Sequence, residues 1–177
     1  MTVPLRPHLF TPVQIGPITL KHRVVMAPLT RSRSEQPGDI PGGLMLEYYS
    51  QRASDGGFIV SEGTSVSLTG RGWLGAPGLY SDQQVEGWKR IIAAVHAKGG
   101  HMFSQLWHTG RSSRVEMAGG HMPVSASVEP PTCLNASGGD CRSTITTATR
   151  STPSMLTAIQ IIRSTICAPP PNLRGGR

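Results

Sequence analysis

Three short apolar runs, each followed at once by polar or glycine residues, constrain the fold of this chain more than any other feature. The runs lie at residues 23–29, 57–61 and 101–107, and two stretches with helical periodicity separate them. Strands joined by helices of this length form right-handed crossovers, so the sheet should be parallel. The carboxyl ends of parallel strands lie at one edge, and we expect the polar residues that follow each run to meet there.

Two helices are predicted between the strands. The first covers residues 44–55 and ends at a pair of glycines, Gly56 and Gly57. The second begins at Ser81, which forms a capping box with Gln84, and it ends at another glycine pair. Its apolar residues recur at steps of three and four, which is the pattern of one buried helix face: Val85, Trp88, Ile91, Ile92 and Val95.

Two further segments have a local signature. Residues 9–25 alternate apolar and polar positions around Gly16 and Pro17, and they predict a short hairpin before the main fold. Residues 65–80 form a long, glycine-rich loop between the second strand and the second helix. A loop of this length inside a compact domain indicates either a functional segment or disorder.

The side chains at the three strand ends are the candidate site. They are Thr30 after the first strand, Glu62 and Gly63 after the second, and Gln105 and Trp107 at the third. Taken singly, each has a simpler explanation: a turn hydroxyl for Thr30, an exposed amide for Gln105 and a core aromatic for Trp107. Glu62 is expected to be a paired or solvated carboxylate rather than a catalytic acid. The loop residues His108 and Arg111 are expected to be solvated.

Charge and cysteine content exclude several classes of protein. The formal net charge is +7, but residues 131–177 carry +4 of it, and there is no run of Lys and Arg, so nucleic-acid binding is not expected. The three cysteines have no metal-ligand spacing, and we expect neither a metal site nor a disulfide framework. No apolar run is long enough for a membrane span, and no leader is evident. A cytoplasmic location is therefore expected, with the oligomeric state left open.

Five ordered motifs resemble the N-terminal part of the old yellow enzyme family, the flavin-dependent ene-reductases that include 12-oxophytodienoate and N-ethylmaleimide reductases. The match covers roughly residues 9–130. The motifs are Met-Ala-Pro-Leu-Thr-Arg at 26–31, Tyr-Tyr-Ser-Gln-Arg-Ala at 48–53, Ser-Glu-Gly-Thr at 61–64, Gly-Ala-Pro-Gly at 75–78 and Gln-Leu-Trp-His-Thr-Gly-Arg at 105–111.

The resemblance implies an α/β fold of the TIM (β/α)8 barrel type, of which this chain would hold the first three βα units and the hairpin. FMN would bind at the carboxyl edge, with NAD(P)H as hydride donor. Thr30 resembles the threonine that bonds the flavin C4 carbonyl, and Gln105 the glutamine that faces the pyrimidine edge. Backbone contacts to the flavin are implied at Pro28, Leu29 and Gly63. Trp107 resembles a residue that shapes the substrate pocket.

By the same resemblance, the reaction is reduction of an alkene conjugated to a carbonyl or nitro group, and no catalytic residue is assigned in this chain. Residues 1–130 would be the barrel part, whereas 131–177 do not match and are expected to be a poorly ordered tail or an out-of-frame segment. The alternative is a truncated, inactive chain, at best a partial flavin-binding or interaction module. Because the arginines that bind the flavin phosphate are not found, weak FMN binding is expected.

Overall fold

A parallel three-stranded sheet is the centre of the fold. The computed structural model describes residues 8–125 and 146–147. Strand β4 (Phe58–Ser65) lies between β3 (Val25–Met26) and β5 (His101–Trp107), and both pairings are parallel. The predicted order of strands and helices and the parallel sheet are therefore confirmed.

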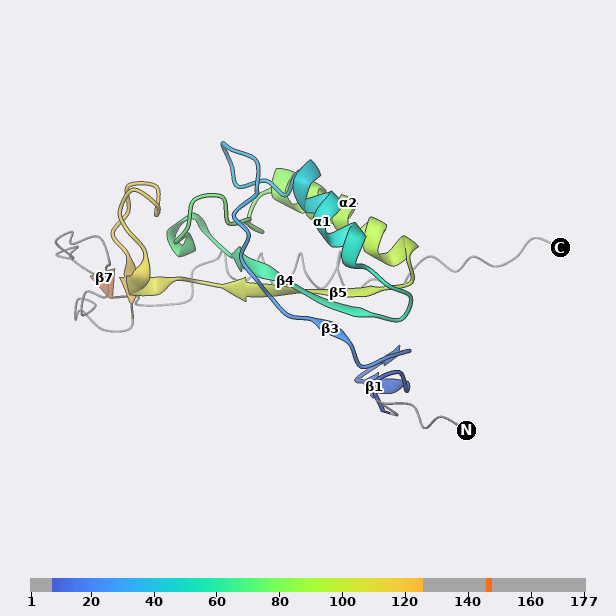
Figure 1. The fold of residues 1–177 in the computed structure, drawn as a ribbon. Helices are drawn as coiled ribbons and strands as arrows, with labels where there is room; N and C mark the ends of the chain where they lie inside the picture. Colours follow the sequence, from blue (N-terminus) through green and yellow to red (C-terminus); the bar gives the residue numbers. More distant parts are fainter. Residues whose placement is uncertain (1–7, 126–145, 148–177) are drawn as a thin grey trace, which may run out of the picture.

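The two connecting helices lie on the same face of this sheet (Figure 1). They are α1 (Gly43–Arg52) and α2 (Asp82–Ala97). The predicted capping box of α2 is present, with the Ser81 hydroxyl accepting from the Gln84 N–H. All five residues of the predicted apolar stripe are buried in the core. The core consists of Met45, Tyr49, Ile59, Leu79, Val85, Trp88, Ile91, Ile92, Val95 and Met102.

Helix α1 ends earlier than its sequence predicts, because the chain must turn before it enters β4. Its last residue is Arg52, and the backbone is extended at Ala53. The predicted glycine stop is part of the following turn, where Gly56 has a left-handed φ of 67°. A Cβ there would lie 2.8 Å from the backbone nitrogen of Lys21. The glycine is required by this close approach rather than by the helix end.

The bounds of two strands also differ from the predicted ones. Strand β3 is shorter than residues 23–29, and Pro28, just beyond it, has no N–H for a ladder hydrogen bond. Strand β4 is longer than 57–61, since it continues through the polar run to Ser65. Its register with β5 shifts between Val60 and Gly63. This irregularity lies just where the polar side chains begin.

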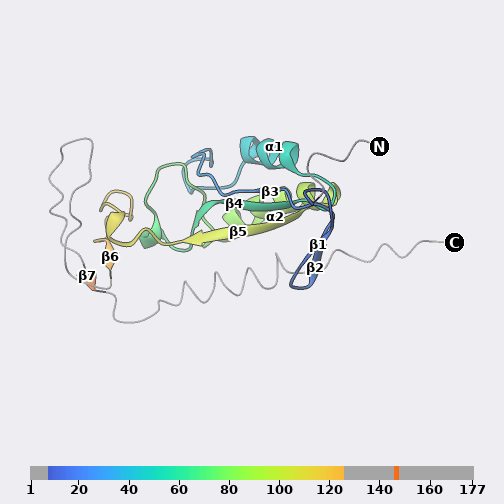
Figure 2. The same ribbon diagram turned by 60° about the horizontal axis from the view of Figure 1, so that its bottom comes forward.

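Small strand pairs extend the fold beyond both ends of the sheet (Figure 2). The predicted hairpin is confirmed as β1 (Val13–Ile15) and β2 (Ile18–Leu20), an antiparallel pair near the amino ends of the strands. Strands β6 (Val124–Ser125) and β7 (Thr146–Thr147) form a parallel pair beyond the carboxyl ends.

The loop of residues 65–80 is packed against the fold. It contains a short 3-10 helix, η1 (Leu68–Gly70), and it buries Val66, Ala76 and Leu79. The Leu79 N–H donates to the Ser65 carbonyl at 2.9 Å, which closes the loop at its base. Disorder, one of the two possibilities that the length of the loop indicated, is therefore excluded.

The predicted disorder of residues 131–177 lies outside the described residues, apart from 146–147. A second 3-10 helix, η2 (Gly110–Ser112), follows β5. Among the helices described, none combines the length and the apolar character needed to cross a membrane.

Candidate functional site at the strand ends

The ends of the three strands meet, as predicted. The backbone N–H of Arg31 donates to Glu62 Oε2 at 3.0 Å, which holds the segment after β3 against the end of β4. Gly63 of β4 is paired with Gln105 of β5. Thr30, the neighbour of Arg31, is therefore brought to the same edge as Gly63 and Gln105.

The two predicted hydrogen-bonding side chains are available for a ligand. Thr30 is half-buried and Gln105 is exposed. The Gln105 N–H donates to the Ser61 hydroxyl at 3.1 Å, so the backbone of this residue is fixed. Across residues 8–125 and 146–147, neither the Thr30 hydroxyl nor the Gln105 carboxamide makes a hydrogen bond. Pro28 and Leu29 are also exposed at this edge.

Trp107 covers Gly63 and is fixed from two sides. A Cβ at Gly63 would lie 2.6 Å from Trp107 Cε3, so a larger residue would displace the indole. The indole N–H donates to the Ser65 hydroxyl at 3.1 Å. The ring stacks on Trp73, with centroids 5.3 Å apart and an interplanar angle of 24°. Trp107 is thus a half-buried aromatic wall beside Gln105.

Glu62 is a buried, paired carboxylate. Its exposed fraction is 1%, which excludes the solvated alternative. The Tyr49 hydroxyl donates to Oε1 at 3.1 Å and accepts from the Glu62 N–H at 2.9 Å. Burial raises the pKa of the Glu62 carboxyl, while hydrogen bonds from Arg31 and Tyr49 oppose the shift. Glu62 of β4 is therefore hydrogen-bonded both to α1, through Tyr49, and to the segment after β3, through the Arg31 N–H.

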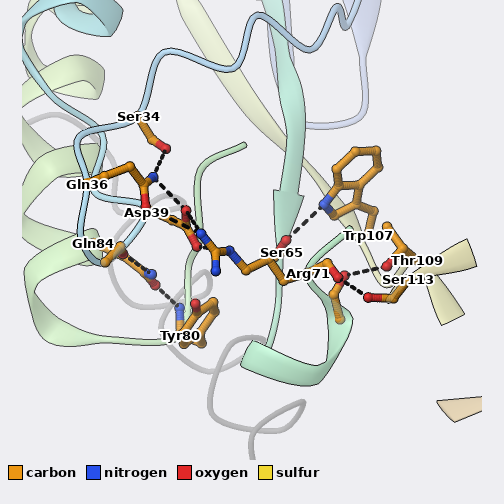
Figure 3. Close-up of polar contacts among 12 residues, drawn as sticks. Ser34, Gln36, Asp39, Ser65, Arg71, Tyr80, Gln84, Trp107, Thr109 and Ser113 are labelled. Atoms are coloured by element: carbon orange, nitrogen blue, oxygen red, sulfur yellow. Dashed lines mark hydrogen bonds and ion pairs between the residues drawn. The ribbon is translucent and has the colours of Figure 1, made fainter. Parts of the chain in front are cut away.

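A buried ion pair lies beside the site (Figure 3). Arg71 contacts both carboxylate oxygens of Asp39: Nη2 donates to Oδ1 at 2.8 Å, and Nε lies 2.6 Å from Oδ2 without the alignment of a hydrogen bond. Gln36 also donates to Oδ1, at 2.7 Å, and its amide nitrogen lies 3.1 Å from the Ser34 hydroxyl. The pair joins the loop after β3 to the loop after β4.

The backbone around Arg71 is bonded to the segment after β5. The Ser113 hydroxyl donates to the Arg71 carbonyl. The Gly70 carbonyl accepts from both the N–H and the hydroxyl of Thr109, at 3.1 and 3.0 Å. Arg71 is therefore the residue at which the loops after all three strands are connected.

Several residues of this site have no local signal in the sequence. Tyr49 belongs to the motif at 48–53, but nothing in that motif indicates its contact with Glu62. Asp39 and Arg71 are 32 positions apart. Trp73 lies in the glycine-rich loop whose length indicated a function, and this is the one signal that could have singled it out.

His108 and Arg111 are exposed, as expected for loop residues. Partial burial lowers the pKa of His108. Its Nδ1 accepts the Gly110 N–H at 3.0 Å, so the ring is held by its own loop. We assign neither residue to the site.

A parallel sheet with helices on one face and polar side chains at its carboxyl edge defines an α/β protein of the barrel or open-sheet class. Residues 8–150 match the profile of the NADH:flavin oxidoreductase / NADH oxidase family, and the chain belongs to this family. Members of the family are oxidoreductases that use FMN, with NAD(P)H as hydride donor.

The similar proteins are old yellow enzyme relatives, which confirms the resemblance. Flavin oxidoreductase hxnT of Emericella nidulans is 47% identical over 130 residues, covering 72% of this chain and 33% of the relative. The 12-oxophytodienoate reductase 7 of Oryza sativa subsp. japonica is 47% identical over 123 residues, covering 69% and 31%. The solved structure of morphinone reductase has a TM-score of 0.65 at 48% identity, covering 73% and 34%. The old yellow enzyme homologue from Zymomonas mobilis gives the same TM-score and identity, with 70% and 34% covered.

The chain spans about a third of the length of these relatives. Its structural neighbours are old yellow enzyme TIM barrels, and it holds part of that fold. The donor set at the strand ends fits the family's cofactor, because a hydroxyl and a carboxamide without partners among the described residues can pair with the carbonyl and imide groups of a flavin ring.

Proposed function

We propose that the isoalloxazine ring of FMN binds at the carboxyl ends of β3, β4 and β5. In this proposal the Thr30 hydroxyl donates to the flavin C4 carbonyl, and the Gln105 carboxamide faces the pyrimidine edge. The observation that carries it is a pair of polar side chains, Thr30 after β3 and Gln105 in β5, that flank the end of β4 and make no hydrogen bond among the described residues. Backbone approach to the ring is proposed at Pro28, Leu29 and Gly63.

The proposed reaction is the reduction of an alkene conjugated to a carbonyl or nitro group. When bound, FMN supplies the hydride from its N5 after reduction by NAD(P)H. A hydroxyl donor at Thr30 stabilises the negative charge that a reduced ring carries, and it therefore tunes the reduction potential. Gln105 donates and accepts at once, which suits an edge with alternating groups. Trp107, held by Ser65 and Trp73, would bound the substrate side of the pocket.

We further propose that β3, β4 and β5 are the first three strands of an eight-stranded barrel. The exposed face opposite the helices supports this. It carries Val25 and Phe103, which are 44% and 43% exposed. The rings of Phe103 and Phe58 meet edge to face, with their centroids 5.1 Å apart. An apolar sheet face of this kind is the inner face of a barrel in the full fold.

The test of the proposed site is an FMN titration of the 177-residue chain, followed by quenching of flavin fluorescence. A neutral hydrogen bond contributes about 0.5–1.5 kcal/mol, so Thr30→Val and Gln105→Ala should each weaken binding by roughly 2- to 13-fold. Gln83→Ala on the exposed surface of α2 is the matched control and should leave binding unchanged. Equal affinity of the Gln105 variant and its control would overturn the assignment.

The reaction is tested separately from binding. Anaerobic oxidation of NADPH by the FMN-loaded chain should proceed faster with a conjugated enone or nitroalkene than with the matching saturated ketone. Binding that depends on Gln105 without any such turnover would contradict the reaction and leave flavin binding as the function of this chain.

A further inference from the structure

The Asp39–Arg71 ion pair is far more buried than the other ion pairs described. Its side chains are 3% and 16% exposed, whereas those of Lys21 and Asp55 are 66% and 67% exposed. Burial of two charges is unfavourable unless they are paired and bonded further, and an apolar pair of the same size is often as stable. Stability alone therefore gives no reason for an ion pair at this position.

Asp39 is fixed before it contacts Arg71. Its backbone is in the left-handed region, with φ at 51°, and its carbonyl accepts the Gly78 N–H at 3.0 Å. Gln36 donates to its carboxylate and also accepts from Arg71 Nη2 at 3.3 Å. A carboxylate held in this way presents a rigid acceptor to the planar guanidinium.

Arg71 also fixes the beginning of the segment that carries Trp73. The backbone of residues 70–71 is bonded to Thr109 and Ser113, and two residues later the chain reaches Trp73. At the other side of Trp73, the Gly75 carbonyl accepts the Ser34 N–H at 3.0 Å. The loop that presents Trp73 is thus fixed at both sides.

Trp73 itself is 50% exposed, so it has no full pocket of its own. Its described aromatic contact is the stack on Trp107. The orientation of an exposed aromatic side chain depends on its backbone, and this backbone begins two residues after Arg71, whose side chain and carbonyl are both bonded.

We propose that Asp39 and Arg71 are positioning residues that hold Trp73 in its stack on Trp107. Given the proposed function, in which Trp107 bounds the substrate pocket, the ion pair fixes the shape of that wall without touching the substrate. The positioning itself requires no bound flavin, and it can be tested on the chain alone.

The readout is the exciton couplet that two stacked indoles give in circular dichroism, defined as the part of the spectrum lost in Trp73→Phe. Asp39→Asn keeps the shape of the side chain but removes its charge, and it should lose most of the couplet. Arg71→Lys keeps the charge without the two-point contact and should lose part of it. Asp55→Asn makes the same chemical change in the exposed pair and should keep the full couplet.

Folding is checked on each variant by cooperative urea unfolding. Should Asp39→Asn fail to fold, Ser113→Ala removes the hydroxyl that donates to the Arg71 carbonyl, along with its longer contact of 3.4 Å to the Arg114 carbonyl, and should still reduce the couplet. A full couplet in folded Asp39→Asn and Arg71→Lys, or in Ser113→Ala where Asp39→Asn does not fold, would overturn the proposal. Because no FMN is present, failure of flavin binding and failure of this positioning are distinguished.

Discussion

The two halves of β4 are stabilised in different ways. Its first half packs Ile59 into the apolar core that includes α2, where the Trp88 indole N–H donates to the Gly78 carbonyl at 3.1 Å. Its second half buries Ser61, Glu62, Thr64 and Ser65, and each of their side chains is hydrogen-bonded.

The two halves of β4 therefore have different roles: the first contributes stability, and the second fixes the positions of neighbouring segments. Apolar contacts are non-directional, so the first half supplies burial energy and tolerates changes that preserve volume. Hydrogen bonds fix distances and angles, so the second half determines where the segment after β3 and the backbone of Gln105 lie. The predictions below separate these two contributions.

The largest effect is expected in the apolar half. Trp88→Ala should lower the free energy of unfolding by about 3–5 kcal/mol, because it opens a cavity against Ile59 and Tyr49. Urea denaturation measures the change. Leu44→Ala, at a side chain that is 65% exposed on α1, is the control and should alter stability by no more than about 0.5 kcal/mol. Similar losses in the two variants would contradict the assignment of the core.

A smaller effect is expected in the polar half. Tyr49→Phe keeps the ring but removes a donor to Glu62 and an acceptor for its N–H, which should cost about 1–3 kcal/mol. The neighbouring Tyr48→Phe is the matched control, since within the described part of the chain that hydroxyl has one hydrogen bond, a long and exposed one of 3.4 Å from Arg31. If both variants unfold at the same urea concentration, the Tyr49–Glu62 contact contributes nothing to stability.

The smallest effect concerns pH. Burial raises the pKa of Glu62 above its ordinary value of 4.5. In the pH interval between the ordinary and the raised pKa, the folded state holds a proton that the unfolded chain has already released. The corresponding stability is present below that ordinary value and is lost as the pH rises through the raised pKa.

Unfolding of Glu62→Gln should therefore depend less on pH over this interval than that of the wild type. Denaturation midpoints across a pH series measure the difference, and the exposed Glu47→Gln is the control. A steeper dependence in Glu62→Gln than in the wild type would show that the sign is wrong.

The apolar half was predictable from the sequence, and the polar half only in part. The stripe and the capping box of α2 are local patterns, so a single stretch of sequence determines both. The strand was predicted to end at residue 61, yet the polar residues that follow continue β4 to Ser65. The partners of this polar half come from α1 and β5: Tyr49, Ser104 and Trp107. Contacts between residues far apart in the sequence produce no periodic pattern from which they could be predicted.

The candidate site shows the same limit. Thr30 and Gln105 could be predicted as candidates because strand ends meet in a parallel sheet and because the motifs resemble a known family. Asp39, Arg71 and Trp73 were not found, since an ion pair between two loops requires the folded geometry to bring its members together.

The most direct test of the flavin site is the response of the Gln105 side-chain amide to FMN, observed by nuclear magnetic resonance of the 15N-labelled chain. Binding of the ring at the carboxyl edge predicts that the Gln105 amide resonances shift progressively with added FMN, while those of Gln83 on α2 stay in place. Unchanged Gln105 resonances at an FMN concentration that shifts other residues, or no shift anywhere, would contradict a flavin site at the ends of β3, β4 and β5.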